Sequence, residues 1–185
     1  MAYFSTRDIA AISLCSSLWA VINWLVAPIF WQLTHLPILC DMVGVSLFII
    51  TLWWTRKPGA VSFMGMIATL LNFILRPGST HFLGFTVASI VFDASTWLLG
   101  YSKRLGLGLL SVVGLVAISF LSTLVAGFII GNLFMNPMFL SKMFGGILVC
   151  AALHGVGGIS GGTMGIIIVK GLEARKIIPQ KVIPR

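Results

Sequence analysis

The sequence has very few charged side chains, and this scarcity points to its class. Only 9% of its 185 residues are charged, whereas 58% are hydrophobic. A soluble domain carries about 25% charged residues because water must solvate its surface. Long apolar runs are instead typical of helices that cross a hydrocarbon core about 30 Å thick. The composition therefore predicts an all-α integral membrane protein without an additional soluble domain.

Cysteine is also scarce, and its spacing suggests no chemistry. Cys15, Cys40 and Cys150 stand far apart within apolar segments and form no CxxC or metal-type pattern. Cysteines in such surroundings usually behave as small buried apolar residues. We therefore expect neither a metal site nor a cofactor. We also expect no cleavable signal peptide, because the first apolar run is long enough to span and no A-x-A-like cleavage site follows it.

Acidic residues are the rarest charged class, with 4 aspartates and glutamates against 12 lysines and arginines. An excess of basic residues can indicate nucleic-acid binding when it forms a patch on one element. Here the basic residues instead punctuate the apolar runs. We therefore expect a lipid bilayer, and no nucleic acid, as the surrounding partner.

Proline, glycine and charged breaks divide the chain into six predicted transmembrane helices. They cover residues 6–27, 36–54, 59–75, 81–100, 105–133 and 143–172. The uncharged, aromatic segment 28–37 is predicted to be a connection, and Asn136 and Pro137 are predicted to close the fifth helix. We expect residues 1–172 to form a single six-helix domain and residues 173–185 to form a basic cytoplasmic tail.

The distribution of basic residues predicts how the helices are oriented. With the N-terminus inside, every lysine and arginine except Arg76 and Lys142 falls on the cytoplasmic side. Cytoplasmic connections are enriched in these residues in membrane proteins. The sequence therefore predicts an N-in/C-in bundle in the cell membrane.

Polar and aromatic residues converge near the predicted outer face. A polar side chain in hydrocarbon is costly, so it usually faces the protein interior and often marks a site. Aromatic faces could stack on a ligand while amides and a carboxylate bond it directionally. The pattern predicts a pocket open to the outside, although each tryptophan alone could be a membrane-interface residue. The predicted binding residues are Asn23, Trp24, Trp31, Gln32, Asp41, Asn72, His81, Phe85 and Asn132.

Two ionisable residues lie deeper than the others. Asp93 on the fourth predicted helix and His154 on the sixth are at similar depths. A hydrogen-bonded pair would offset the cost of burying both. We predict such a structural pair, with the floor of the binding pocket or a coupling element as the alternative role.

Small residues at four-residue spacing allow close helix contacts in lipid. The last predicted helix is rich in such glycines, and the first carries a weaker set. These faces could serve internal packing or a partner subunit.

An enzymatic alternative rests on the four residues 158–161, which match the GxSG motif of rhomboid-type intramembrane proteases. The serine nucleophile of such an enzyme needs a histidine base from another helix. Ser160 lies in the last helix, and His154 lies on that same helix with a different azimuth. We therefore predict that the protein is not an enzyme.

Several short motifs together carry a resemblance that covers nearly the whole chain. These are residues 4–8 (FSTRD), 28–31 (PIFW), 39–41 (LCD), 81–85 (HFLGF) and 91–93 (VFD). With six helices in fewer than 200 residues and no ATP-binding motif, the chain resembles the substrate-binding S component of an energy-coupling factor (ECF) transporter. The similarity is to the subfamily associated with thiamine or its hydroxymethylpyrimidine precursor.

The resemblance implies high-affinity capture of a vitamin outside the cell. It also implies a transmembrane T subunit and two cytoplasmic ATPases as partners, whose ATP hydrolysis makes the S component topple and release its substrate inward. The family's partner contact uses small residues of the first helix, which here correspond to Ala11, Cys15, Ser13 and Ser17. Two alternatives remain: a stand-alone secondary transporter or channel, although no internal repeat favours it, and a structural membrane scaffold.

Overall fold

A computed structural model of the chain describes residues 3–100, 108–177 and 179, and the regular secondary structure among them is helical, with no strand. The predicted cytoplasmic charges Lys103, Arg104, Lys181 and Arg185 lie outside the described residues, as does Leu105, the predicted start of the fifth helix. The elements are α1 (Thr6–Leu25), α2 (Ala27–Thr34), α3 (Ile38–Thr55), α4 (Ala60–Leu75), the short 3₁₀ helix η1 (Thr80–Phe82), α5 (Leu83–Leu98), α7 (Leu109–Ile129), the π-helical turn η2 (Ile130–Phe134), α8 (Pro137–Phe144) and α9 (Ile147–Ala174).

The segment after the first long helix is not the irregular connection that the sequence predicted. It forms the short helix α2, with Pro28 near its start. Proline is well tolerated in a first turn, because its missing N–H would have no helical partner there. The proline therefore ends one helix and begins another.

The region around Asn136 and Pro137 behaves in the same way. The Asn136 side chain accepts a hydrogen bond from the Met138 backbone N–H at 2.9 Å and caps the short helix α8. Gly145 and Gly146, with φ values of 72° and 130°, separate α8 from α9. Glycine adopts such positive φ values without steric penalty. The last helix consequently begins later than the predicted Met143.

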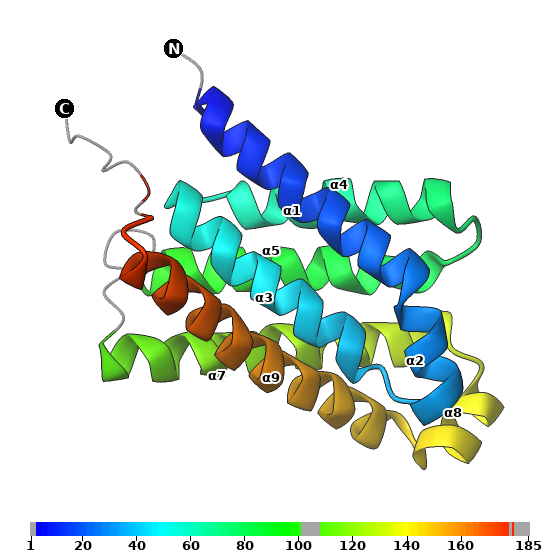
Figure 1. Cartoon of the computed structure of the whole chain (residues 1–185). Coiled ribbons are helices and arrows are strands. Elements are labelled where there is room, and N and C mark those ends of the chain that lie inside the picture. The colour runs from blue at the N-terminus through cyan, green and yellow to red at the C-terminus, as the bar shows by residue number, and fades with distance from the viewer. Residues whose placement is uncertain (1–2, 101–107, 178, 180–185) are drawn as a thin grey trace.

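The six long helices are arranged so that the ends of the bundle differ (Figure 1). Both described termini lie at one end, and α2 and α8 lie at the other. We call these the terminal end and the α2/α8 end. Helix α9 packs along α7 and α3, while α1 packs against α4.

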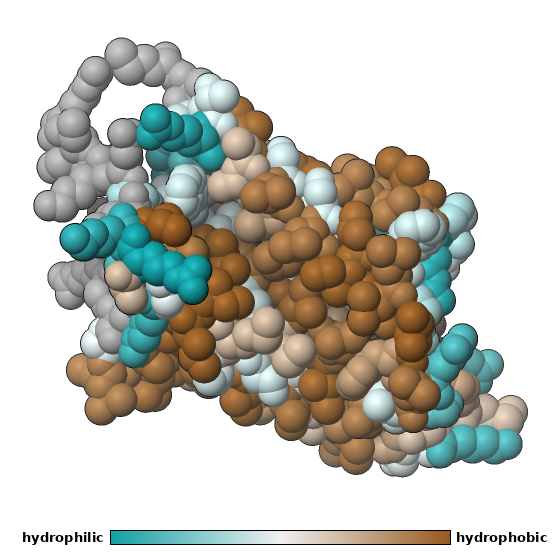
Figure 2. Space-filling view, viewed as in Figure 1, coloured by the Kyte–Doolittle hydropathy of each residue, from teal (hydrophilic) through white to brown (hydrophobic). Residues whose placement is uncertain are grey.

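Four helical segments are long and apolar enough to cross a membrane, namely α1, α3, α7 together with η2, and α9. Helices α4 and α5 have 16 residues each, which corresponds to a length of about 24 Å. Figure 2 shows that one face of the molecule is hydrophobic across its middle and hydrophilic toward its two ends. The six spans and the direction of the termini remain predictions.

The helices approach closely where glycine or a small hydroxyl residue faces a neighbouring backbone. A Cβ atom at Gly158 would meet Thr123 and the backbone of Ser119, and one at Gly161 would meet the backbone of Met42. The Ser46 hydroxyl also donates a hydrogen bond to the Gly161 carbonyl at 3.0 Å. The glycine-rich face of α9 thus serves internal packing against α7 and α3.

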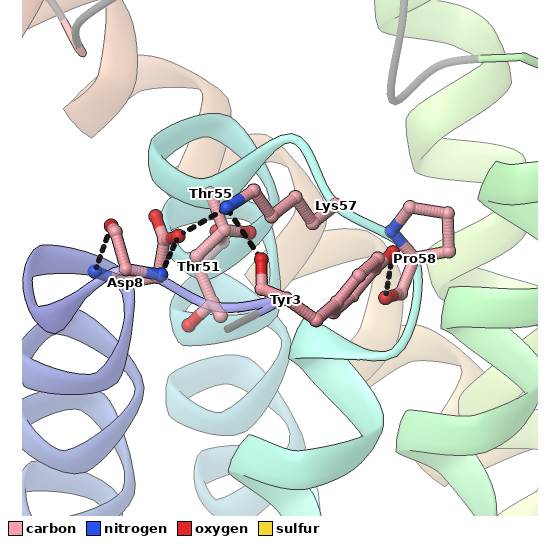
Figure 3. Close-up of polar contacts among 7 residues, drawn as sticks. Tyr3, Asp8, Thr51, Thr55, Lys57 and Pro58 are labelled. Atoms are coloured by element: carbon pink, nitrogen blue, oxygen red, sulfur yellow. Dashed lines mark hydrogen bonds and ion pairs between the residues drawn. The ribbon is translucent and has the colours of Figure 1, made fainter. Parts of the chain in front are cut away.

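A polar network ties the start of α1 to the turn between α3 and α4 (Figure 3). Asp8 accepts a hydrogen bond from the Ser5 backbone N–H at 2.8 Å and forms an ion pair with Lys57 Nζ at 2.7 Å. Lys57 also donates to the Tyr3 carbonyl at 2.9 Å, and the Tyr3 hydroxyl donates to the Pro58 carbonyl at 3.1 Å. These contacts fix the terminal end of α1 against the bundle.

Candidate ligand-binding site

Three aromatic side chains meet inside the bundle toward its α2/α8 end. Trp19 of α1 stacks on Phe85 of α5 with ring centroids 3.7 Å apart, and Phe82 of η1 packs edge-on at 5.4 Å. All three are buried. A Cβ atom at Gly44 would meet Trp19 and Phe85, so this glycine lets α3 approach the rings. We call Trp19, Phe82 and Phe85 the aromatic cluster.

Buried polar side chains surround the aromatic cluster. Asn23 lies one helical turn after Trp19, on the same side of α1. Asn72 lies one turn after Thr69, whose hydroxyl donates a hydrogen bond to the Phe82 carbonyl at 3.1 Å. Both amides are almost fully buried, with exposures of 3% for Asn23 and 1% for Asn72.

Asp41 lies near the aromatic cluster, because the preceding residue, Cys40, contacts Trp19. The Asp41 side chain pairs with His154. The Trp19 indole N–H donates to the Cys40 carbonyl at 3.3 Å, directly before Asp41. His154 Nδ1 lies 2.6 Å from Asp41 Oδ2, and both side chains are buried. The pair joins α3 to α9, which pack along one another.

The predicted pairing of Asp93 with His154 is wrong. Asp93 instead accepts hydrogen bonds from the backbone N–H and the hydroxyl of Ser62, each at 2.9 Å. The first turn of a helix leaves backbone N–H groups without helical partners, so a carboxylate stabilises it. Asp93 thus accepts a hydrogen bond from a backbone N–H group in the first turn of α4, at the terminal end of the bundle. His154 pairs with Asp41 instead.

Several polar atoms around the aromatic cluster have no hydrogen-bond partner. In the part of the chain that the structure describes, six buried side-chain atoms lack one, and four of them belong to this region: Asn23 Oδ1 and Nδ2, Asn72 Oδ1 and His154 Nε2. A buried polar atom without a partner costs about 1–3 kcal/mol. Such atoms are few in native structures, so their concentration here identifies a candidate site for a polar ligand.

The structure does not bring all the predicted site residues to this region. Trp24 is 47% exposed on the outside of α1. Gln32, His81 and Asn132 are exposed too, and the Asn132 amide donates to the Phe128 carbonyl of its own helix. Trp31 packs against Phe144 of α8, in a second apolar cluster. Asn23, Asp41, Asn72, Phe85 and His154 are the predicted residues that adjoin the aromatic cluster.

The sequence analysis did not identify Trp19 and Phe82 as site residues. Trp19 precedes Asn23 by four residues, the spacing that places two side chains on one side of a helix. Trp24 directly follows Asn23 and therefore points about 100° away. Helical periodicity could thus have selected Trp19 over Trp24. No comparable signal marks Phe82, which lies in a 3₁₀ turn.

The terminal end of the bundle carries a groove of a different kind. It has a volume of about 390 Å³ and a predominantly apolar lining. Of the four predicted partner residues, Ala11 and Cys15 line it, whereas Ser13 and Ser17 lie on exposed parts of α1. The remaining lining residues are Arg7, Ala10, Leu14, Ile50, Trp53, Trp54, Leu172 and Ile177.

The serine of the protease-like motif is not activated by a histidine. Ser160 Oγ donates a hydrogen bond to the Val156 carbonyl of its own helix at 3.0 Å. His154, the histidine nearest to it in sequence, bonds to Asp41. The motif is therefore accounted for by helix packing in α9.

Comparison with known proteins identifies the fold. No family model matches the chain, and no curated protein matches its sequence. A solved structure described as "Crystal structure of an S-component of ECF transporter" matches with a TM-score of 0.63 and 20% identity, over 94% of this chain and 88% of that chain. The likeness shows that the two proteins share a fold over most of their lengths.

Proposed function

We propose that the protein is the substrate-binding S component of an ECF transporter. The observation that carries this proposal is the fold shared with such a component over 94% of the chain. The buried polar atoms around the aromatic cluster also support the proposal, because they have no hydrogen-bond partner within the described residues and a bound ligand would supply one. The protein would bind its substrate at the α2/α8 end of the bundle.

The ligand that fits the site is a small polar heteroaromatic molecule, and we propose thiamine or its hydroxymethylpyrimidine moiety. The motifs quoted above resemble the subfamily associated with these compounds. An aminopyrimidine needs an aromatic stacking surface and hydrogen-bonding groups around its edge. Trp19 and Phe85 stack on each other with ring centroids 3.7 Å apart, so a ligand ring would stack here by displacing one of them. Asn23, Asn72 and His154 would offer the polar groups.

We further propose that a transmembrane T subunit, with two cytoplasmic ATPases, docks at the groove near the start of α1. Ala11 and Cys15 are the small residues of α1 that line it, and the surrounding apolar side chains suit a helix of a membrane partner. Both termini would then lie in the cytoplasm, as the positions of the basic residues favour. The substrate site and the partner site would lie at opposite ends of the bundle.

Native mass spectrometry of the gently purified protein tests the proposal. We expect a retained molecule with the mass of thiamine or hydroxymethylpyrimidine, and we expect a T subunit and ATPases to co-purify from membranes. A retained flavin, biotin or lipid would overturn the proposed ligand. Ligand uptake into vesicles that contain the protein alone would overturn the dependence on ATPase partners.

A further inference from the structure

Two buried amides lie on neighbouring helices that pack against each other, Asn23 on α1 and Asn72 on α4. The Ser16 hydroxyl donates to the Met64 carbonyl at 2.9 Å, which fixes the register of α1 against α4. Asn23 and Asn72 each lie about two turns beyond that contact along their helices. Both helices run from the terminal end toward the α2/α8 end (Figure 1). The register therefore places the two amides at one level of the interface, next to the aromatic cluster.

The two amides differ in what they can offer to a ligand. Asn72 Nδ2 donates to the Ala68 carbonyl at 2.9 Å, so its Oδ1 is presented as an acceptor, and that oxygen has no partner. Asn23 has no partner for either amide atom among the described residues. Asn23 can therefore present its donor and acceptor in either orientation, whereas Asn72 presents an acceptor alone.

We propose that Asn23 and Asn72 together recognise an amidine edge, meaning an exocyclic amino group next to a ring nitrogen in a heteroaromatic ligand. The amino group has two N–H bonds, and these would donate to Asn72 Oδ1 and Asn23 Oδ1. The ring nitrogen would accept from Asn23 Nδ2. Asparagine makes a comparable bidentate contact with adenine, in which it pairs with the N6 amino group and the ring nitrogen N7. The inference rests on the proposed function and names the part of the pyrimidine that the protein recognises.

This arrangement gives the two residues separate roles. A ligand with an oxo group in place of the amino group turns an acceptor toward Asn72 Oδ1, which is also an acceptor. Asn23 can match the oxo ligand by turning its amide around, but Asn72 could do so only by giving up its bond to Ala68. Asn72 is therefore the residue that discriminates, and Asn23 is the residue that strengthens binding of either ligand.

Calorimetric titration of the purified protein tests these roles with 4-amino-5-hydroxymethyl-2-methylpyrimidine and its 4-oxo counterpart. We expect the wild type to prefer the amino compound by about tenfold or more, because the oxo compound leaves a buried acceptor unpaired. Asn72→Leu should reduce that preference to about threefold or less. Asn23→Leu should weaken both compounds by about tenfold and keep the preference. The matched control is Asn132→Leu, an exposed asparagine outside the region, which should change neither affinity.

The outcomes separate this inference from the proposed function. A wild type that binds both pyrimidines equally, or an Asn72→Leu protein that keeps the full preference, would overturn the recognition of the amidine edge and leave the proposed function standing. A wild type that binds neither pyrimidine would overturn the proposed ligand as well. If circular dichroism shows that Asn72→Leu does not fold, the wild-type preference and the Asn23→Leu affinities still decide the matter.

Discussion

At the scale of single residues, the Asp41–His154 pair is a buried ionisable contact that joins α3 to α9. Glycines make room for it, because a Cβ atom at Gly157 would meet Asp41 and one at Gly127 would meet His154. The short 2.6 Å separation is typical of a hydrogen bond assisted by charge. The pair therefore positions the His154 ring, whose other nitrogen, Nε2, is buried without a hydrogen-bond partner among the described residues.

The stability losses from removing Asp41 and from removing His154 should not add, because the two side chains pair with one another. We expect Asp41→Ala and His154→Ala each to lower the free energy of unfolding by about 3–5 kcal/mol, because each leaves a buried partner uncompensated. The double variant should lose about 1–3 kcal/mol less than the sum of the single losses. Unfolding in mixed detergent micelles, followed by circular dichroism, measures these differences. Strictly additive losses would show that the two side chains do not interact.

The residue that pairs with His154 could not be read from the sequence. Asp93 and His154 were predicted to pair because their positions along their helices place them at similar depths in the membrane. Similar depth does not show which helices lie side by side. Asp93 is on α5, which packs against α4 and α7, whereas Asp41 is on α3, which packs along α9. Pairing depends on the order of helices around the bundle, and hydropathy does not encode that order.

At the scale of elements, the sequence predicted the six long helices within a few residues but not the two short ones. Apolar periodic runs bounded by proline, glycine or charge identify long helices reliably. The short helices α2 and α8 were predicted as connections because each has a proline in its first turn. A proline that ends one helix is also well suited to begin the next. The polar and aromatic residues of these short helices then lie outside the aromatic cluster, as Gln32 and Trp31 do.

The glycines of α9 give a prediction at this scale. At Gly161 an added Cβ would meet the backbone of Met42, whereas at Gly171, on the same helix, it would meet nothing within 4 Å. We expect Gly161→Ala to lower the free energy of unfolding by about 1–3 kcal/mol, because α3 and α9 must move apart. Gly171→Ala is the control, and it should be neutral or stabilising by up to about 1 kcal/mol because alanine favours a helix. Equal stability of the two variants in thermal unfolding would mean that α3 and α9 do not pack this closely.

At the scale of the whole molecule, the two ends of the bundle carry different chemistry. The α2/α8 end holds four of the six buried polar atoms without partners among the described residues, and the terminal end holds an apolar groove and the Asp8–Lys57 network. The sequence analysis predicted that the two ends would differ, because it assigned most basic residues to one end and the polar and aromatic residues to the other. The sequence could not predict the groove, because its walls come from α1, α3, the end of α9 and the segment after it, which only the fold brings together.

Filling the groove should separate partner binding from substrate binding. We expect Ala11→Trp to reduce co-purification of the T subunit and ATPases by about tenfold or more, because a large side chain would occupy a central part of an interface. The same variant should keep wild-type affinity for the pyrimidine ligand, since the aromatic cluster lies at the other end of the bundle. Ser17→Trp is the matched control on the exposed side of α1. If Ser17→Trp rather than Ala11→Trp prevents co-purification, the partner binds the exposed face of α1 and the groove serves another purpose.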